Sequence, residues 1–460
     1  MIVKNPIAQA LLMILASGAV FMDYLDTSIV SIALPAISQS TGMSSTGSSW
    51  VMTSYLLALG STLLLFGKIA DRTGRHKLIF ISGFALFTLS SIFCGLSTSM
   101  ILLIIFRVVQ GIAAAAMVST STMLITLHLP LEKQGFATGV IATLGGVALA
   151  CGPFVGGILT EFISWHWIFF INIPIGIIGI IMSIFLIPKY EKQPSAAEKK
   201  PFDVIGAALL AASLIALLAG FELGASDGWS LPIILLIVIS PMLMAVFLRR
   251  ELNHPDPVMS TKLLLSRTIM FSSLCMLLIT VVFLGMIYIM PFYLTSNLGY
   301  GAALAGIIML IPPVVNALIG IPAGALTKKF GCMRLCNVAA ICQALGMLMI
   351  VFSIIISNLP ILFIGLGFVG LGTGMNEAPG IRRVNIHAPI NLQGSSSGLV
   401  FTVMNVGCVI GVALFSIVAT IVSDSTVFTN EGVYAACLAG AFVSILAYIS
   451  SRLARDTIKY

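Results

Sequence analysis

The sequence predicts an all-α integral membrane protein with fourteen transmembrane helices, and three observations predict it. Of the 460 residues, 59% are apolar and only 8% are charged, whereas a soluble domain carries about 25% charged residues. Charged residues and clusters of Gly, Pro and Ser divide the chain into fourteen apolar segments, each close to the roughly 20 residues that cross a bilayer. The basic residues fall in alternate connections. This composition excludes a soluble enzyme and a disordered chain, and the net charge of +7 is spread too thinly for a nucleic-acid-binding surface.

The fourteen predicted helices are separated by short polar connections. Their approximate ranges are 8–34, 49–69, 78–97, 100–127, 136–160, 166–187, 203–223, 231–249, 268–295, 302–326, 334–356, 360–380, 395–422 and 432–452. The first is far longer than the roughly 7 to 15 residues of a signal-peptide core, so we expect it to be retained. The longest polar stretch runs only from Pro188 to Pro201, so we expect no soluble domain.

The basic residues indicate the orientation of the chain. If the N-terminus is cytoplasmic, 22 of the 23 Lys and Arg residues occupy inner positions. The acids at predicted outer helix ends are Glu161, Glu222, Asp227, Asp424 and Glu431. Because cytoplasmic loops carry an excess of Lys and Arg, we expect a multi-pass protein of the plasma membrane with both termini in the cytoplasm.

A weak internal repeat divides the chain into two halves. The segment GKIADRTG at 67–74 follows the second predicted helix, and GALTKKFG at 324–331 follows the tenth. Such repeats are common in transporters. We therefore predict an N-terminal six-helix bundle at 1–188, a cytoplasmic linker at 189–202, two additional helices at 203–250 and a C-terminal six-helix bundle at 251–460.

The sequence contains no pattern typical of a metal or nucleotide site. The eight cysteines lie mostly within apolar segments and form no CxxC pair, so we interpret them as small apolar side chains rather than metal ligands. The chain also lacks the GxxxxGK[ST] loop that cradles nucleotide phosphates. We expect no metal and no cofactor, with a proton gradient as the energy source.

Five motifs occur in order along the chain. They are LDTSIVSIALP at 25–35, the loop at 67–77, RVVQG at 107–111, GVALACGPFVGG at 146–157 and WHWIFFINIPIG at 165–176. On these motifs the chain resembles the major facilitator superfamily, and within it the fourteen-helix drug:proton antiporters, which are multidrug efflux pumps. The resemblance covers essentially the whole chain. It implies the major facilitator fold, with two six-helix bundles plus two extra helices.

The resemblance assigns the loop after the second helix to gating between inward-open and outward-open states. The gating residues it implies are Gly67, Asp71, Arg72, Gly74 and Arg75. Gly67 and Gly74 suit a tight backbone. Asp71 lies at a helix C-terminal end, where the macrodipole disfavours an anion, so we expect it to have a partner at the helix N-terminus formed by residues 395–397. The alternative is a solvated loop that only orients the chain.

The fifth helix is unusually rich in glycine and proline. Small residues at such spacing allow close helix contact, and the resemblance implies that this motif marks exporters. Its residues are Gly146, Gly152, Pro153, Gly156 and Gly157. Pure packing is the alternative interpretation.

Three ionisable residues stand out at membrane depth: Asp23 and Asp26 in the first helix and Arg107 in the fourth. A charge there costs at least about 2.5 kcal/mol, so its default interpretation is functional. Taking the first helix to end near Leu34, Asp26 is about 12 Å deep, and Arg107 is about 10 Å from Met100. The two acids share a helix face. We predict a proton-coupling site in which Asp26 matches the acid of the family; a static buried ion pair is the alternative.

A substrate site is predicted from residues on helices that line the central cavity in the family. Aromatic and Met side chains suit bulky apolar cations. The candidates are Tyr55, Tyr288, Phe292, Tyr293, Asn316, Glu377, Phe401, Met404 and Asn405. Glu377 could attract a cationic substrate or pair with Arg382 or Arg383, and each aromatic residue could instead belong to the core.

Together these features predict a proton-coupled secondary exporter of hydrophobic, cationic drugs that works by alternating access. Its partners would be small-molecule drugs, protons and the lipid bilayer, without nucleic acid, and we expect a monomer rather than an oligomer. One alternative is a proton-coupled exporter of one specific metabolite or siderophore. Another is a membrane sensor or scaffold that transports nothing. An enzyme is not expected, because no nucleophile, base and metal set converges at one depth.

Overall fold

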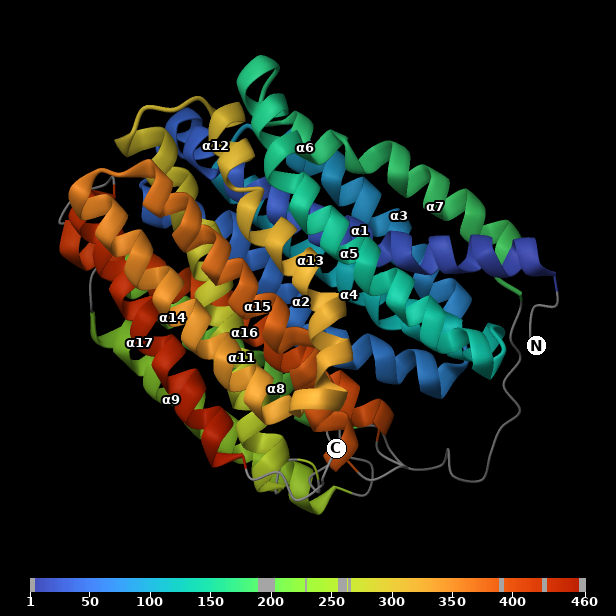
Figure 1. Cartoon of the computed structure of the whole chain (residues 1–460). Coiled ribbons are helices and arrows are strands. Elements are labelled where there is room, and N and C mark those ends of the chain that lie inside the picture. Colours follow the sequence, from blue (N-terminus) through green and yellow to red (C-terminus); the bar gives the residue numbers. More distant parts are fainter. Residues whose placement is uncertain are drawn as a thin grey trace.

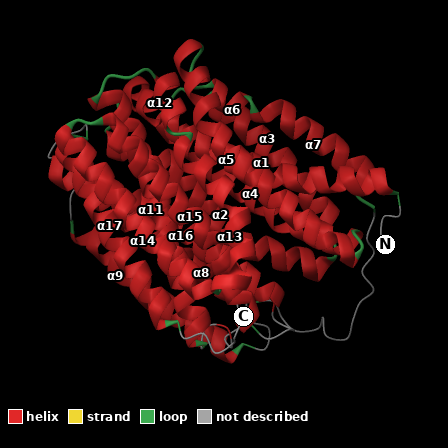
Figure 2. Ribbon diagram, viewed as in Figure 1, coloured by secondary structure: helices red, strands yellow, loops and turns green. Residues whose placement is uncertain are grey.

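The computed structural model describes residues 5–188, 203–227, 230–254, 263, 266–388, 393–423 and 428–454. Every regular element within these ranges is a helix (Figure 2). The predicted linker at 189–202 lies outside the described residues.

The first half of the chain forms six long helical segments, the last of them broken into two helices. They are α1 (Pro6–Thr41), α2 (Ser45–Thr73), α3 (His76–Gly95), α4 (Met100–His128), α5 (Leu131–Phe162), and the pair α6 (Trp167–Phe170) and α7 (Asn172–Leu186). Side chains of Asn5, Ser44 and Ser99 accept hydrogen bonds from backbone N–H groups at the starts of α1, α2 and α4. These caps satisfy donors that have no partner inside the helix.

Two helices, α8 (Val204–Asp227) and α9 (Leu231–Asn253), follow the first half. Helix α8 packs against both α2 and α16, so it contacts the first and the second half at once. Helix α9 packs chiefly on α8 and exposes most of its apolar side chains. The pair therefore lies at the edge of the interface between the two halves.

The second half repeats the plan of the first. Its helices are α11 (Arg267–Phe292) with the π-helix η2 (Tyr293–Asn297), α12 (Ala302–Ile308), α13 (Ile311–Phe330), α14 (Cys332–Ile356), α15 (Leu359–His387), α16 (Gln393–Ser423) and α17 (Asn430–Leu453). In both halves the fourth segment packs against the second and the third, as α4 does on α2 and α3 and α15 does on α13 and α14. The two halves thus share this packing pattern.

Thirteen helices in the described part of the chain are long and apolar enough to cross a membrane. The remaining predicted span corresponds to α8, which has 24 residues, or about 36 Å of helix. Its described apolar part is Ile205–Leu217. An all-helical membrane fold is therefore confirmed.

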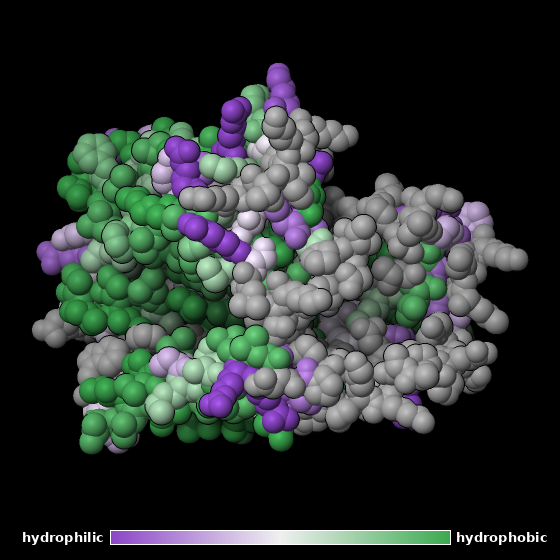
Figure 3. Space-filling view, turned by 90° about the horizontal axis from the view of Figure 1, so that it is seen from below, coloured by the Kyte–Doolittle hydropathy of each residue, from purple (hydrophilic) through white to green (hydrophobic). Residues whose placement is uncertain are grey.

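The halves meet along a few helices. Helix α2 contacts α16, α5 contacts α12 and α13, and α1 contacts α11. In Figure 1 the blue-to-green first half lies beside the yellow-to-red second half, and the start of α1 and the end of α17 lie on the side away from α6 and α12. Seen from below, hydrophilic side chains gather among apolar ones on that side (Figure 3).

The first helix is longer than predicted. Pro35 lies inside α1, and the helix continues to Thr41, where Gly42 adopts a left-handed conformation with φ of 68°. Proline interrupts only part of the hydrogen-bond ladder, and surrounding helices can tolerate the break. The expected end near Leu34 is therefore wrong, and Gly42 provides the actual stop.

Candidate functional site

A fully buried ion pair joins α1 to α4. Arg107 Nη1 donates to Asp26 Oδ2 and, at 2.8 Å, to Gln110 Oε1, and the side chains of Arg107 and Asp26 have no exposed surface. Asp26 Oδ1 accepts from Gln110 Nε2 at 3.0 Å and from Asn172 Nδ2 at 2.9 Å. Gln110 also donates to Ser91 Oγ at 2.8 Å. Helices α1, α4 and α7 thus meet at one carboxylate, and α3 joins the network through Ser91.

The second helix completes the surroundings of Arg107. Its Nε donates to the Val51 carbonyl at 2.8 Å, and its guanidinium carbon lies 4.1 Å from the centre of the Tyr55 ring. A cation over an aromatic face is attracted by the ring quadrupole. Among the described residues, Arg107 Nη2 has no hydrogen-bond partner. The cation is therefore held firmly but retains one donor group for another ligand.

Asp23 occupies a different environment from Asp26. The Tyr55 hydroxyl donates to Asp23 Oδ1 at 2.6 Å, and Asp23 keeps 6% of its surface exposed while Asp26 keeps none. Tyr55 thus connects the acids, with its ring against Arg107 and its hydroxyl on Asp23. Asp26 is enclosed by three donors, whereas Asp23 retains limited access.

Asp26 and Arg107 touch and therefore lie at one level, although the helix end from which the depth of Asp26 was counted is wrong. Because α1 ends at Thr41, Asp26 lies 15 residues before that end, or about 22 Å. Arg107 remains seven residues from the start of α4, or about 10 Å. Because the two residues lie at the same level, the outer part of α1 extends beyond the start of α4.

Sequence reasoning missed three polar partners: Gln110, Asn172 and Ser91. Gln110 lies three residues after Arg107 on the same face of α4, and Asn172 begins α7. Both belong to motifs at 107–111 and 165–176. A polar side chain at membrane depth needs a partner, and that signal could have found them.

Glu377 on α15 faces the same central region from the second half. It lies within hydrogen-bonding range of Asn316 on α13. Tyr24 on α1 interacts electrostatically with both Asp23 and Glu377. Acids from the two halves therefore flank one region.

The arginines near Glu377 have other contacts. Arg382 Nη1 donates to Thr327 Oγ1. Arg383 donates to the Ala454 carbonyl at 2.5 Å and to Ser451, at the end of α17. No ion pair joins either arginine to Glu377 in the described part of the chain. The structure therefore does not contain the pairing considered from the sequence.

The other predicted substrate residues are dispersed. Tyr288 and Phe292 are buried and pack edge-on with Phe428, at ring separations of 5.6, 6.2 and 5.3 Å. Tyr293 is buried beside them at the start of η2. The remaining three lie on α16, where Phe401 is exposed, Met404 is partly buried and Asn405 donates to the Phe401 carbonyl. Only Tyr55 touches the ion-pair network directly.

The loop after α2 is only partly as expected. Gly74 ends α2 with φ of 67° and donates its N–H to the Ala70 carbonyl, whereas Gly67 lies inside the helix. The expectation of a tight turn at Gly67 is therefore wrong, because α2 continues for six more residues. Lys77 Nζ donates to the carbonyls of Ile184 and Ile187 at 2.7 Å, which ties the loop to the end of α7.

Other parts of the predicted gating arrangement are less completely described. Arg75 is exposed just after Gly74. The side chains of Asp71, Arg72 and residues 395–397 lie outside the described residues. The partner of Asp71 therefore stays a prediction.

The glycine-rich motif of α5 lies between the two halves. A Cβ at Gly156 would come within 2.8 Å of Ile29 Cγ1 on α1, and one at Gly157 within 3.0 Å of Ala303 Cα on α12. Gly152 also faces α1, Pro153 faces Gly306 of α12, and Gly146 faces Ala317 of α13. Larger side chains would push these helices apart.

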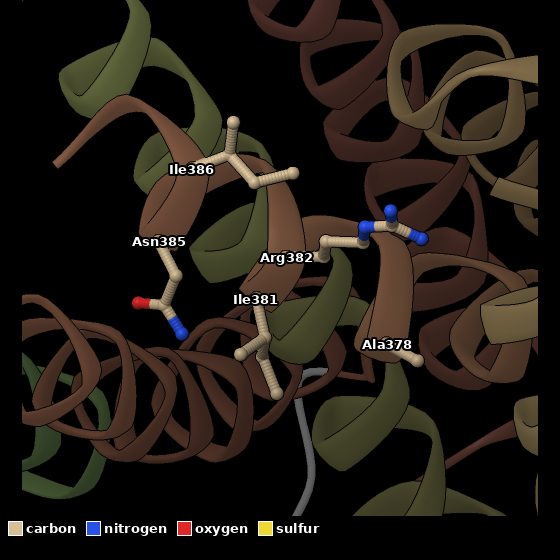
Figure 4. A pocket seen from close by; sticks show the side chains of 5 residues that line it. All are labelled: Ala378, Ile381, Arg382, Asn385 and Ile386. Atoms are coloured by element: carbon tan, nitrogen blue, oxygen red, sulfur yellow. The ribbon is translucent and has the colours of Figure 1, made fainter. Parts of the chain in front are cut away.

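A cavity of about 450 Å³ lies along the last turns of α15, lined by Ala378, Ile381, Arg382, Asn385 and Ile386. Figure 4 shows Arg382 and Asn385 projecting to different sides of this helix end. The cavity contains an arginine and no acid among its lining residues. It is therefore a poor match for the cation site predicted from the acids.

Two repeated helical bundles around a polar site at membrane depth define a membrane transport protein rather than an enzyme. Residues 16–412 match the Major Facilitator Superfamily. The chain belongs to this family, and it is a transporter of the major facilitator fold.

Three similar proteins are consistent with membership of this family. The chain is 33% identical to the multidrug export protein EmrB of Escherichia coli K12 over 68% of this chain and 62% of that protein. It is 30% identical to the putative multidrug resistance protein MdtD of Escherichia coli O6:K15:H31, over 95% and 93%. It is also 28% identical to the riboflavin transporter RibZ of Clostridioides difficile strain 630, over 88% and 87%.

Solved structures share the fold. An inward-facing, unoccupied bacterial homologue of the lysosomal transporter Spinster superposes with a TM-score of 0.65 at 14% identity, covering 98% of both chains. The D323A mutant of the nucleoside transporter NupG superposes with a TM-score of 0.66 at 13% identity, covering 97% of this chain and 99% of that one. At such identity the likeness concerns the fold alone.

Proposed function

We propose that this transporter is a multidrug:proton antiporter that exports hydrophobic, cationic compounds by alternating access. The observation that carries the proposal is the Asp23–Tyr55–Arg107–Asp26 chain of contacts in the first half. Burying charged groups is costly, and α1 and α2, which carry three of these four residues, contact α11 and α16 of the second half. The relatives EmrB and MdtD, whose names describe drug export and resistance, support the same direction of transport.

Within this cluster the two acids have different roles. Asp26 accepts from Arg107, Gln110 and Asn172, so it holds the cation in place. Asp23 accepts from Tyr55 and keeps some exposure. We assign the exchanged proton to Asp23 and a positioning role to Asp26, which reverses the order of preference drawn from the sequence.

Charge balance explains why a proton and a cation would compete. With Asp23 ionised, Asp23, Asp26 and Arg107 together carry one net negative charge; with Asp23 protonated they carry none. A cationic drug or a proton can neutralise that charge, but binding both is unfavourable. Glu377 on α15 adds a further carboxyl group from the other half. Each proton moving inward gains about 2.3 kcal/mol per 100 mV.

The remaining features of the proposal concern the whole protein. We place it in the plasma membrane with both termini in the cytoplasm, as the distribution of Lys and Arg indicates. We propose that it works as a monomer and uses the proton gradient without a cofactor.

The similarity to a riboflavin transporter supports a second candidate function, the transport of one specific metabolite. A neutral, planar substrate would use the aromatic side chains rather than the acids. Transport of riboflavin with no response to cations would favour this candidate.

The test is proton flux in proteoliposomes containing the full-length protein and a pH-sensitive dye inside. Addition of hydrophobic cations should move protons, whereas neutral analogues and riboflavin should not. Asp23→Asn should bind cations weakly and abolish the coupled flux while keeping the wild-type melting temperature. Glu431→Gln, at an exposed acid on α17, is the matched control and should retain full flux.

Asp26→Asn separates the two roles. It should also abolish flux, but with a lowered melting temperature, because Arg107 loses its counter-ion. Full gradient-dependent efflux by Asp23→Asn would refute the assignment of the proton. Absence of drug-driven flux in the wild type would refute antiport altogether.

A further inference from the structure

We propose that the start of α8 and the end of α9 form a binding site for one anionic phospholipid. A cavity of about 500 Å³ lies there, lined by Ile205 and Leu209 of α8 and by Val246, Arg249, Arg250 and His254 at the end of α9. The site is separate from the Asp26–Arg107 network. It does not depend on what the protein transports.

The apolar wall of this cavity faces outward. Ile205 and Val246 expose 58% and 53% of their surfaces. Helix α9 packs chiefly on α8, so its outer face has few protein neighbours. Such a wall suits a hydrocarbon chain that continues from the bilayer.

The cavity also has a cationic part, which is built on a fixed contact. Arg250 Nε donates to Asp203 Oδ1 at 2.7 Å, and Asp203 Oδ1 also accepts from the Gly206 backbone at 2.8 Å. Asp203 is fully buried, whereas the Arg250 side chain is 35% exposed. This bond therefore holds the guanidinium at Nε, while the side chain stays partly exposed and lines the cavity.

The local acids do not line the cavity. Asp203 and Glu251 are both buried, and their carboxylates lie 2.5 and 3.2 Å from the position of a Cβ on Gly206 of α8. The cavity lining includes Arg249, Arg250 and His254 but neither acid. The cluster thus turns its positive side outward and its negative side toward α8.

A cationic edge beside an apolar wall identifies the ligand as an amphiphile with a phosphate headgroup. Basic pockets between transmembrane helices at the cytoplasmic surface bind such headgroups, and the excess of Lys and Arg assigns this end to the cytoplasm. A free phosphate would not use the wall formed by Ile205, Leu209 and Val246. We therefore commit to an anionic phospholipid.

The experiment measures lipid binding to the full-length protein in detergent by native mass spectrometry. The probes are dioctanoyl phosphatidylglycerol, dioctanoyl phosphatidylcholine and glycerol phosphate. We expect one saturable site that prefers phosphatidylglycerol to the other two probes. Arg249→Gln should weaken it about fivefold, whereas Arg249→Lys should retain the binding. Arg334→Gln, at an exposed arginine of α14, is the matched control and should change nothing.

A second variant tests the apolar wall without removing charge. Val246→Trp should fill the cavity and reduce binding of phosphatidylglycerol. Equal binding of the two lipids, or an equal effect of Arg249→Gln and Arg334→Gln, would overturn the proposal. Glycerol phosphate binding as tight as phosphatidylglycerol would show a free-anion site and would overturn it too.

Discussion

The two halves of this transporter share one packing plan but differ in their polar core. Gly111 of α4 lies against the backbone of Tyr55 in α2, and Gly370 of α15 lies against the backbone of Pro312 in α13. Counting back four residues from each glycine gives Arg107 in the first half and Leu366 in the second. Both side chains are fully buried. The same place in the fold is therefore occupied once by a cation and once by a hydrocarbon.

The second half has a buried polar side chain that is hydrogen-bonded without any charged partner. Gln343 of α14 donates to the Ile279 carbonyl at 3.0 Å, and Ser444 of α17 donates to Gln343 at 3.4 Å. The packing plan consequently does not require an ion pair. Since buried charges are costly, the pair in the first half is better explained by function than by folding.

The largest expected effect comes from making the first half like the second. Arg107→Leu leaves the Asp26 carboxylate buried without its cation, which should cost about 3 to 5 kcal/mol of stability. The measurement is unfolding of the purified protein in detergent. Replacing both partners, Arg107→Leu with Asp26→Leu, should recover most of that stability but no transport. Wild-type stability of the single variant would mean that the pair contributes nothing to folding.

The reverse change should have a somewhat smaller effect. Leu366→Arg places a cation in the apolar core of the second half, and insertion of such a charge costs about 2.5 to 3.5 kcal/mol. The yield of folded protein in the membrane should fall, and Leu366→Met should be tolerated because it conserves volume. Normal yield of Leu366→Arg would indicate an unrecognised counter-ion.

The two equivalent glycines sharpen the comparison. A Cβ at Gly111 would lie 2.9 Å from the Ala58 Cβ and still closer to the Tyr55 carbonyl, and one at Gly370 would lie 2.9 Å from the Pro312 Cα. Gly111→Ala and Gly370→Ala should each lower the free energy of unfolding by about 1 to 3 kcal/mol, because the added methyl group overpacks the helix contact. The measurement is again unfolding of the purified protein in detergent. Only Gly111→Ala should also impair proton flux, because it displaces Tyr55. Gly320→Ala on α13, where an added Cβ would have no neighbour within 4 Å, is the control.

The smallest effect is expected at the N-terminal end of α8, where Asp203 lies. Burial alone raises the pKa of Asp203, but hydrogen bonds from Arg250 and the Gly206 backbone outweigh it and lower the pKa below its usual value. The ionised form is therefore favoured in the folded state. Asp203→Asn should lower the free energy of unfolding by on the order of 0.5 kcal/mol near pH 7.

The sign of the pH dependence follows from the lowered pKa. Stabilisation by Asp203 is complete above the ordinary Asp value of about 3.9 and is lost as the pH falls through the lower folded value. The difference in melting temperature between wild type and Asp203→Asn should therefore shrink only below about pH 4. A difference that disappears already near pH 6 would contradict the ion pair.

The sequence by itself determined the class of the protein, the positions of nearly all the helices and the acids and arginine at membrane depth. These follow from local properties, because the cost of placing a charge in hydrocarbon and the length of an apolar run are read residue by residue. The end of α1 escaped this reasoning, since Pro35 predicts a break that packing tolerates. Only the tertiary structure decided that Asp26, rather than Asp23, accepts hydrogen bonds from Arg107, Gln110 and Asn172. Those donors are separated from Asp26 by 81 to 146 residues of chain, and their meeting depends on how closely the helices pack.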